Sequence, residues 1–186
     1  NPAAAIHHGA MRLFRSQLET PLGPMVVLTD ERHLRLLEFA DAMDRVEDWI
    51  DRRFGRPEFV ETPDPLGVET ALGAYFAGRL DAIDAVPVAA GGTPFQERVW
   101  AGLRGIPAGE TRTYAGFAEA IGHATAQRAV GAANGRNPIA IVVPCHRLVG
   151  SDGGLTGYGG GIARKRWLLA HEGAAVNRRA GSSGRA

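Results

Sequence analysis

The sequence lacks several features that would each narrow its role. It has one cysteine, Cys145, among 186 residues, so neither an internal disulfide nor a four-cysteine zinc site is possible. No apolar run is long enough to cross a membrane, and the N-terminus does not have the basic-then-apolar order of a signal peptide. We therefore expect a cytoplasmic or nuclear protein, with the cytoplasm as the first choice, in which Cys145 works as a lone thiol. We expect no metal or other cofactor.

Lysine is as scarce as cysteine. The basic residues are 20 arginines and a single lysine, Lys165. The two side chains are not equivalent, since lysine carries a compact ammonium on a flexible stem. Lys165 therefore indicates a position that needs an ammonium, although codon bias and chance remain competing explanations.

The net charge of +1 hides an asymmetry between the two halves of the chain. Residues 1–90 contain nine arginines against 15 Asp and Glu, a net charge of −6. Residues 91–186 contain 12 Arg and Lys against five Asp and Glu, a net charge of +7. This pattern favours a polyanionic partner for the second half alone.

The first half is predicted to be a small antiparallel sheet with helices. Short apolar runs separated by turns indicate a three-stranded meander, and apolar residues at helical spacing indicate two helices. A further stretch, residues 82–90, is expected to be extended. The predicted strands are 13–18, 25–29 and 34–39, and the predicted helices are 44–54 and 66–76.

The second half is predicted to be mainly helical. Thr93, Pro94 and Gln96 have the pattern of an N-cap, a first helical residue and a capping box. Two short helices, 114–121 and 125–134, are joined by a tight turn as in a helix-turn-helix. The second is rich in small residues, which let its backbone approach another surface; packing against another helix is their commoner use.

The remaining segments surround Cys145. Residues 139–143 form an apolar, β-branched run that predicts a buried extended segment. A glycine-rich loop covers 150–161, and an amphipathic helix covers 162–172. Gly91-Gly92 separates proposed domains at 11–90 and 91–173, and residues 1–10 and 174–186 are expected to be flexible tails.

The segment Pro144-Cys145-His146-Arg147 carries the candidate chemistry. A thiol is nucleophilic only as thiolate, and its ordinary pKa of about 8.5 requires a base or positive charge nearby. His146 and Arg147 supply both types, and Glu172 could orient the imidazole. A buried structural Cys-His pair is the commoner reading, and a cysteine hydrolase is a second alternative.

Five motifs in order between residues 93 and 172 closely resemble the O6-alkylguanine-DNA alkyltransferases, also called methylated-DNA–protein-cysteine methyltransferases. The N-terminal half resembles this family only loosely, in its length and its Thr-Pro-Leu-Gly-Pro turn. The resemblance implies a ribonuclease-H-like α/β (α+β) first domain and a second domain with a winged helix-turn-helix-like motif. The matching motifs are GETRTY at 109–114, RAVG at 128–131, GRNPIAIVVPCHR at 135–147, LTGYGGG at 155–161 and RKRWLLAHE at 164–172.

The resemblance also implies a reaction. Cys145 would irreversibly accept the alkyl group from guanine O6 in a single turnover, and O4-alkylthymine is a further candidate substrate. His146 would act as a base through a water molecule, held by Glu172. Tyr114 and Lys165 would stabilise the departing guanine. The residues implied to shape the pocket and its hinge are Asn137, Pro144, Leu148, Tyr158, Gly159 and Gly160.

The implied partner is double-stranded DNA containing alkylated guanine, bound by a monomer that could assemble cooperatively. The damaged nucleotide would be flipped out of the duplex, with Arg128 entering the vacated space. The recognition helix would lie in the minor groove, whose base code is degenerate. The residues implied to contact DNA are Thr113, Ala126, Arg128, Gly131 and Ala132.

Two positions depart from familiar members of this family. Gly159 replaces a small polar residue, and Asn134 lacks bulk, so we expect the pocket to accept alkyl groups larger than methyl. Three other readings compete with the transferase: a lesion-binding relative without chemistry, a repair-coupled regulator and a plain helix-turn-helix repressor. Lesion-binding relatives lack the acceptor cysteine, which this chain has. A regulator would need more cysteines to build a metal-binding domain, and a plain repressor leaves Cys145 unexplained.

Overall fold

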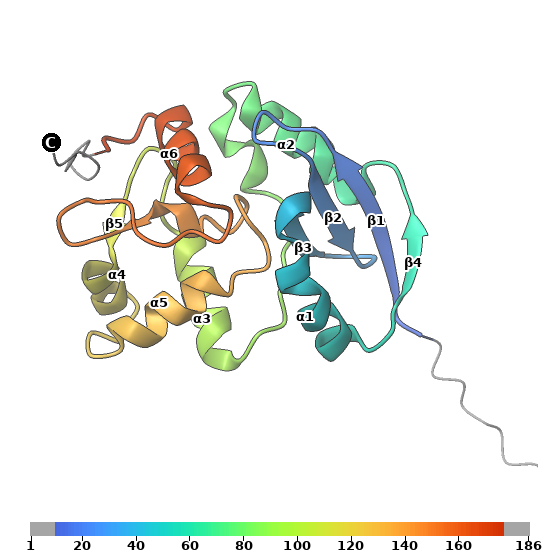
Figure 1. Ribbon diagram of the computed structural model, residues 1–186, viewed down its shortest axis with the longest axis horizontal. Helices are drawn as coiled ribbons and strands as arrows, with labels where there is room; N and C mark the ends of the chain where they lie inside the picture. Colours follow the sequence, from blue (N-terminus) through green and yellow to red (C-terminus); the bar gives the residue numbers. More distant parts are fainter. Residues whose placement is uncertain (1–9, 177–186) are drawn as a thin grey trace, which may run out of the picture.

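The computed structural model describes residues 10–176; the predicted tails therefore lie almost entirely outside the described residues. A sheet with helices on both faces forms one end of the molecule, and a group of helices forms the other (Figure 1). No helix within 10–176 is both long and apolar enough to cross a membrane. The strands are β1 (Arg12–Leu18), β2 (Met25–Thr29), β3 (Leu34–Phe39), β4 (Glu58–Glu61), β5 (Arg112–Thr113) and β6 (Leu148–Val149), and the α-helices are α1 (Asp44–Phe54), α2 (Val68–Phe76), α3 (Pro94–Arg104), α4 (Tyr114–Ala120), α5 (Gln127–Gly135) and α6 (Ile162–His171).

The sheet has the order β3-β2-β1-β4. The predicted meander of β1, β2 and β3 is confirmed, because both pairs are antiparallel. The prediction of a wholly antiparallel sheet is wrong: β4 pairs in parallel with β1, so the sheet is mixed. Strand β4 has three exposed residues of four, and it lacks the apolar alternation by which strands are recognised in a sequence.

Both faces of the sheet are buried, which explains why β3 is almost continuously apolar. Successive side chains of a strand point to opposite faces. Leu36 accordingly packs with Val46 and Ile50 of α1, while Leu37 belongs to the core that contains Leu72 of α2. This larger core continues into the second half of the chain, so the two halves share apolar packing.

The helices of the first half differ in how well their bounds were predicted. Helix α1 has the predicted bounds. Helix α2 begins at Val68 because Leu66 and Gly67 both have positive φ, and the Asp64 carboxylate then accepts from the backbone N–H of Glu69 at 2.7 Å. Residues 82–90 are not extended throughout, since a short 3₁₀ helix, η3, covers Leu80–Ile83.

The second half begins with the predicted capping box. Thr93 Oγ1 accepts from the Gln96 backbone N–H at 3.2 Å, and Gln96 Oε1 accepts from the Thr93 backbone N–H at 2.9 Å. Two short helices follow: α4, capped by the Thr113 side chain, and α5. Strands β5 and β6 pair in parallel beside them. The predicted helical character of this half is confirmed.

The segment before Cys145 corrects a prediction. Residues 139–143 are buried as expected, but they are not extended: the chain forms a single bridge to β3 at Ile139 and then turns. Ile141 has φ of 68°, which is rare for a β-branched residue. Two backbone hydrogen bonds to Leu37 bind this turn to the first half. The Leu37 N–H donates to Pro138 O at 3.0 Å, and the Ala140 N–H donates to Leu37 O at 2.8 Å. It therefore fixes the cysteine relative to the sheet.

Candidate active site

Cys145 lies on a short 3₁₀ turn, η4 (Cys145–Arg147), with Pro144 at its N-cap. On a strand, the side chains of Cys145 and His146 would point in opposite directions. The turn removes this constraint. The cysteine is only 7% exposed. Its carbonyl accepts from Asn134 Nδ2 at 3.3 Å, so the last turn of α5 supports the backbone that carries the thiol.

Asn137 ties the preceding turn together. Its Oδ1 accepts from the Ile139 backbone N–H at 2.9 Å. Its Nδ2 donates to Val143 O at 2.8 Å and to Ile139 O at 3.2 Å. A buried amide that uses both its donor and its acceptor on one loop holds that loop in a single conformation. Asn137, for which a hinge role is predicted, thus lies within the turn that precedes Cys145.

Glu172, immediately after α6, is the centre of a buried polar network. Its Oε1 lies 2.8 Å from His146 Nε2 and accepts from Tyr75 OH at 2.8 Å. Arg147 donates to both carboxylate oxygens, at 2.7 and 3.0 Å. Burial alone would raise the pKa of Glu172, but hydrogen bonds from His146 and Arg147 outweigh burial and hold that pKa at about 2.

Arg147 does not lie where the sequence indicated. We expected its charge to assist the thiol, but its guanidinium points to Glu172 and to the carbonyl of Ile106. Its positive charge is therefore balanced by Glu172. The neighbouring imidazole then faces a carboxylate whose charge is already shared, and burial lowers the pKa of His146.

A neutral His146 that donates from Nε2 to Glu172 has its other nitrogen, Nδ1, free to accept. That atom is buried and has no hydrogen-bond partner among the described residues. An unsatisfied buried acceptor costs free energy unless a water molecule or a proton donor reaches it. The arrangement is thus that of a base waiting for a proton, with its orientation fixed by Glu172.

The thiol is protonated in the resting protein. Burial raises the pKa of Cys145 to about 11, and the Glu38 carboxylate adds to this rise. The Asn137 amide and the Lys165 ammonium oppose it. Because thiolate is scarce at neutral pH, removal of the thiol proton has to be coupled to the reaction.

Lys165 is fully buried. Its ammonium donates to Leu148 O at 2.6 Å and to Thr156 O at 2.9 Å. Burial lowers the pKa of Lys165 to about 8, although the nearby Cys145 opposes this shift. An ammonium has three donors. Two of them hold backbone carbonyls, one just before the glycine-rich loop and one within it, so the single lysine both braces that loop and places positive charge near the thiol.

A cavity of about 20 Å³ lies beside Cys145, which is room for about one water molecule. Two buried polar atoms along it, Asn134 Oδ1 and the Tyr158 hydroxyl, have no hydrogen-bond partner among residues 10–176. Unpaired atoms of this kind can form hydrogen bonds with the polar edge of a heteroaromatic ring. Gly159 and Gly160, which we expected to shape the base pocket, line the same cavity.

The residues predicted to contact DNA lie around α5. Arg128 is exposed on its first turn, and Gly131 follows on the same helix. Together with Tyr114 and Gln127 they line an open depression of about 390 Å³. Ala132 is exposed, Ala126 lies just before the helix, and Thr113 caps α4. Burial raises the pKa of the Tyr114 hydroxyl, which therefore stays protonated.

Sequence reasoning missed three residues of the site, all from the first half. Tyr75 reaches Glu172 from α2, while Glu38 and Arg45 line the cavity of Cys145. Tyr75 is indistinguishable from an ordinary core residue in the sequence. Glu38 did carry a signal, because it is an acidic residue on a strand with the apolar residues Leu37 and Phe39 directly beside it.

Comparison with known proteins gives a consistent result over both halves of the chain. Residues 13–90 match the family described as 6-O-methylguanine DNA methyltransferase, ribonuclease-like domain. Residues 94–174 match 6-O-methylguanine DNA methyltransferase, DNA binding domain. The expected fold, a ribonuclease-like domain followed by a helical DNA-binding domain, is confirmed.

Individual relatives cover nearly the whole chain. The methylated-DNA–protein-cysteine methyltransferase of Shigella flexneri is 48% identical over 166 residues, which are 88% of this chain and 97% of that protein. That of Methanosarcina barkeri is 45% identical over 156 residues, 82% of this chain and 92% of that protein. The crystal structure of the Mycobacterium tuberculosis enzyme in complex with DNA has a TM-score of 0.72 at 41% identity, covering 88% of this chain and 93% of that one.

Proposed function

Because the chain belongs to the methylated-DNA–protein-cysteine methyltransferase family, which repairs O6-methylguanine in DNA by methyl transfer to a cysteine, we propose that Cys145 is the acceptor. The observation that carries this assignment is the position of the thiol. It borders a cavity that contains unpaired polar atoms, and the next residue is a histidine oriented by a buried carboxylate. It is also the only cysteine of the chain.

The reaction is a single displacement. The sulfur of Cys145 forms a bond to the alkyl carbon, the bond from that carbon to guanine O6 breaks, and its electron pair moves into the purine. The thiol proton leaves toward His146 Nδ1 through a bridging water. A ring nitrogen of guanine takes a proton from the Tyr114 hydroxyl. The imidazolium of His146 then loses its proton to solvent and the Tyr114 phenolate regains one from solvent, so the net change moves one proton from thiol to guanine. The thioether is stable, and the protein therefore reacts once.

Three further residues support this step. Glu172 keeps the acceptor nitrogen of His146 directed away from itself, because it occupies the Nε2 side of the ring. Lys165 holds the carbonyls of Leu148 and Thr156 in place. Its positive charge favours the developing thiolate and the anionic leaving group alike.

The DNA geometry is part of the proposal. A base within a duplex cannot reach the buried thiol, so the nucleotide is flipped out at a cost on the order of a few kcal/mol. Arg128 fills the vacated space, and the small residues of α5 let the helix backbone approach the minor groove. Repair of O4-alkylthymine, cooperative binding, a monomeric state, a cytoplasmic location and domain bounds of 11–90 and 91–173 stay predictions from the sequence.

Intact mass spectrometry after incubation with O6-methylguanine DNA tests the proposal. We expect one added methyl group per chain, located on Cys145 by peptide mapping, with no turnover. A Cys145→Ser variant is expected to bind the same DNA and gain no mass. A wild-type protein that stays unmodified, or a methyl group on another residue, would falsify the assignment.

A further inference from the structure

Gly159 lies against an arginine from the other half of the molecule. Its backbone is not among the positive-φ conformations that favour glycine, so conformation alone would permit a side chain here. A Cβ at this position would nevertheless lie 2.5 Å from Nη1 and Nη2 of Arg45. The space that a residue 159 side chain would use is therefore already filled by the Arg45 guanidinium.

Arg45 is held in this place by a buried carboxylate. Its Nη2 donates to Glu38 Oε2 at 2.9 Å, and Glu38 Oε1 accepts from the Phe39 backbone N–H at 2.9 Å. The Glu38 side chain is 3% exposed, whereas that of Arg45 is 45% exposed. The pair thus has a fixed inner end on β3 and an outer end that faces solvent.

Both members of this pair line the cavity next to Cys145. A cavity of about 20 Å³ is far smaller than an alkylated guanine, so part of its wall has to move when the base enters. The open space expected beside Gly159 is absent in this conformation, because Arg45 occupies it.

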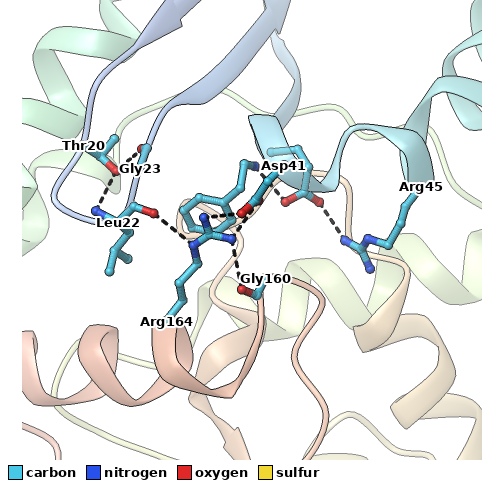
Figure 2. A network of polar contacts seen from close by, with 9 residues as sticks. Thr20, Leu22, Gly23, Asp41, Arg45, Gly160 and Arg164 are labelled. Carbon is cyan, nitrogen blue, oxygen red and sulfur yellow. Dashed lines mark hydrogen bonds and ion pairs between the residues drawn. The ribbon is translucent and has the colours of Figure 1, made fainter.

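The other side of the loop is held more firmly. Arg164 of α6 donates to both carboxylate oxygens of Asp41, at 2.8 and 2.9 Å, and also to Leu22 O and Gly160 O. Figure 2 shows this arginine between the three groups, with Arg45 standing apart on the neighbouring helix. The Arg164 guanidinium also lies 4.0 Å from the ring centroid of Phe39. Arg45, with one carboxylate partner and a solvent-facing end, is the part of the wall that moves at least cost.

We propose that Arg45, anchored by Glu38, sets the size of the alkyl group that the Cys145 pocket accepts. This inference rests on the proposed function of Cys145. O6-methylguanine requires only a small displacement of the guanidinium, which keeps its hydrogen bond to Glu38. A larger group, such as benzyl, requires the guanidinium to leave Gly159 and turn to solvent, which separates it from Glu38. Size selection is thereby carried by the first half of the chain, across from the thiol.

The test compares rates of transfer from duplexes that contain O6-methylguanine or O6-benzylguanine, followed by intact mass. Arg45→Ala is expected to raise the benzyl-to-methyl rate ratio by about tenfold, a typical effect of changing pocket volume. Glu38→Gln, which keeps the shape but removes the charge, should raise the ratio less. Arg52→Ala is the matched control, because Arg52 is an exposed arginine of the same helix and does not line this cavity.

The ratio separates a pocket role from a structural one. Loss of a merely stabilising ion pair would lower both rates together and leave the ratio unchanged, and that result would overturn the inference. A double-mutant cycle adds an independent measurement: Gly159→Ala should alter the ratio less when Arg45 is already alanine. Equal effects in both backgrounds would contradict the contact. A wild type that takes up neither alkyl group contradicts the proposed function as well, whereas a reactive protein with an unchanged ratio contradicts only the size inference.

Discussion

Two buried carboxylates lie close to Cys145, and their surroundings differ: Glu38 lines the cavity of the thiol, and Glu172 contacts the neighbouring His146. Glu172 accepts from His146, Tyr75 and twice from Arg147. Glu38 accepts from one backbone N–H and from a half-exposed arginine. The pKa of Glu172 is lowered by its donors, whereas burial raises the pKa of Glu38 despite its arginine.

The difference separates a fixed charge from an adjustable one. A carboxylate with four donors stays ionised and orients the groups around it, which suits the partner of a catalytic histidine. A carboxylate with few donors is only partly compensated for the loss of its water on burial. Its arginine partner can therefore move away at low cost. Both sites connect the two halves of the chain, through Tyr75 in one case and Arg45 in the other.

Among the variants of the two carboxylates, Glu172→Gln should lower the free energy of unfolding most. The amide cannot balance Arg147, which would remain as a buried cation, and loss of one partner of a buried ion pair typically costs about 3–5 kcal/mol. Urea unfolding should show a decrease of that size. Glu38→Gln is the control and should cost much less, because Arg45 can reach solvent. Equal losses for the two variants would show that the networks do not differ as described.

Tyr75→Phe sharpens the comparison at intermediate size. It removes one donor to Glu172 and should lower the free energy of unfolding by about 1–2 kcal/mol. Tyr158→Phe is the matched control, since the Tyr158 hydroxyl is buried and has no partner among the described residues. Its removal should be neutral or stabilising. A Tyr75→Phe variant as stable as Tyr158→Phe would mean that Tyr75 contributes nothing to the Glu172 network.

The sequence predicted the residues of this comparison unequally. The motif around Cys145 identified His146 and Glu172, because both lie in continuous segments of the second half. Tyr75, Glu38 and Arg45 come from separate elements of the first half, and their meeting with the site depends on how β3, α1 and α2 pack. Local patterns predict helices such as α1 and α3. They do not predict contacts between residues about 100 positions apart, such as that of Tyr75 with Glu172.

The same limit explains two of the errors of fold. Strand β4 exists because β1 offers it an edge to pair with, not because its own residues alternate. The run at 139–143 has the composition of a strand, but Asn137 and the bonds to Leu37 fold it into a turn. In both cases tertiary hydrogen bonds outweigh local preference.

The two carboxylates should have opposite pH dependence, and the change at Glu38 is the smallest of the predicted effects. Glu172, with its pKa held at about 2, contributes stability that is present above its ordinary pKa of 4.5 and is lost as the pH falls toward 2. Glu38, with a raised pKa, contributes stability that is full below 4.5 and is lost as the pH rises through its folded-state pKa. The charges facing Glu38 are Arg45 and Arg164. The stability of Glu38→Gln relative to wild type should therefore improve slightly from pH 4.5 to 7, while Glu172→Gln should flatten the loss of stability below pH 4.5. Urea unfolding across this pH range measures both, and a Glu38→Gln curve parallel to wild type would show that Arg45 already balances Glu38 in full.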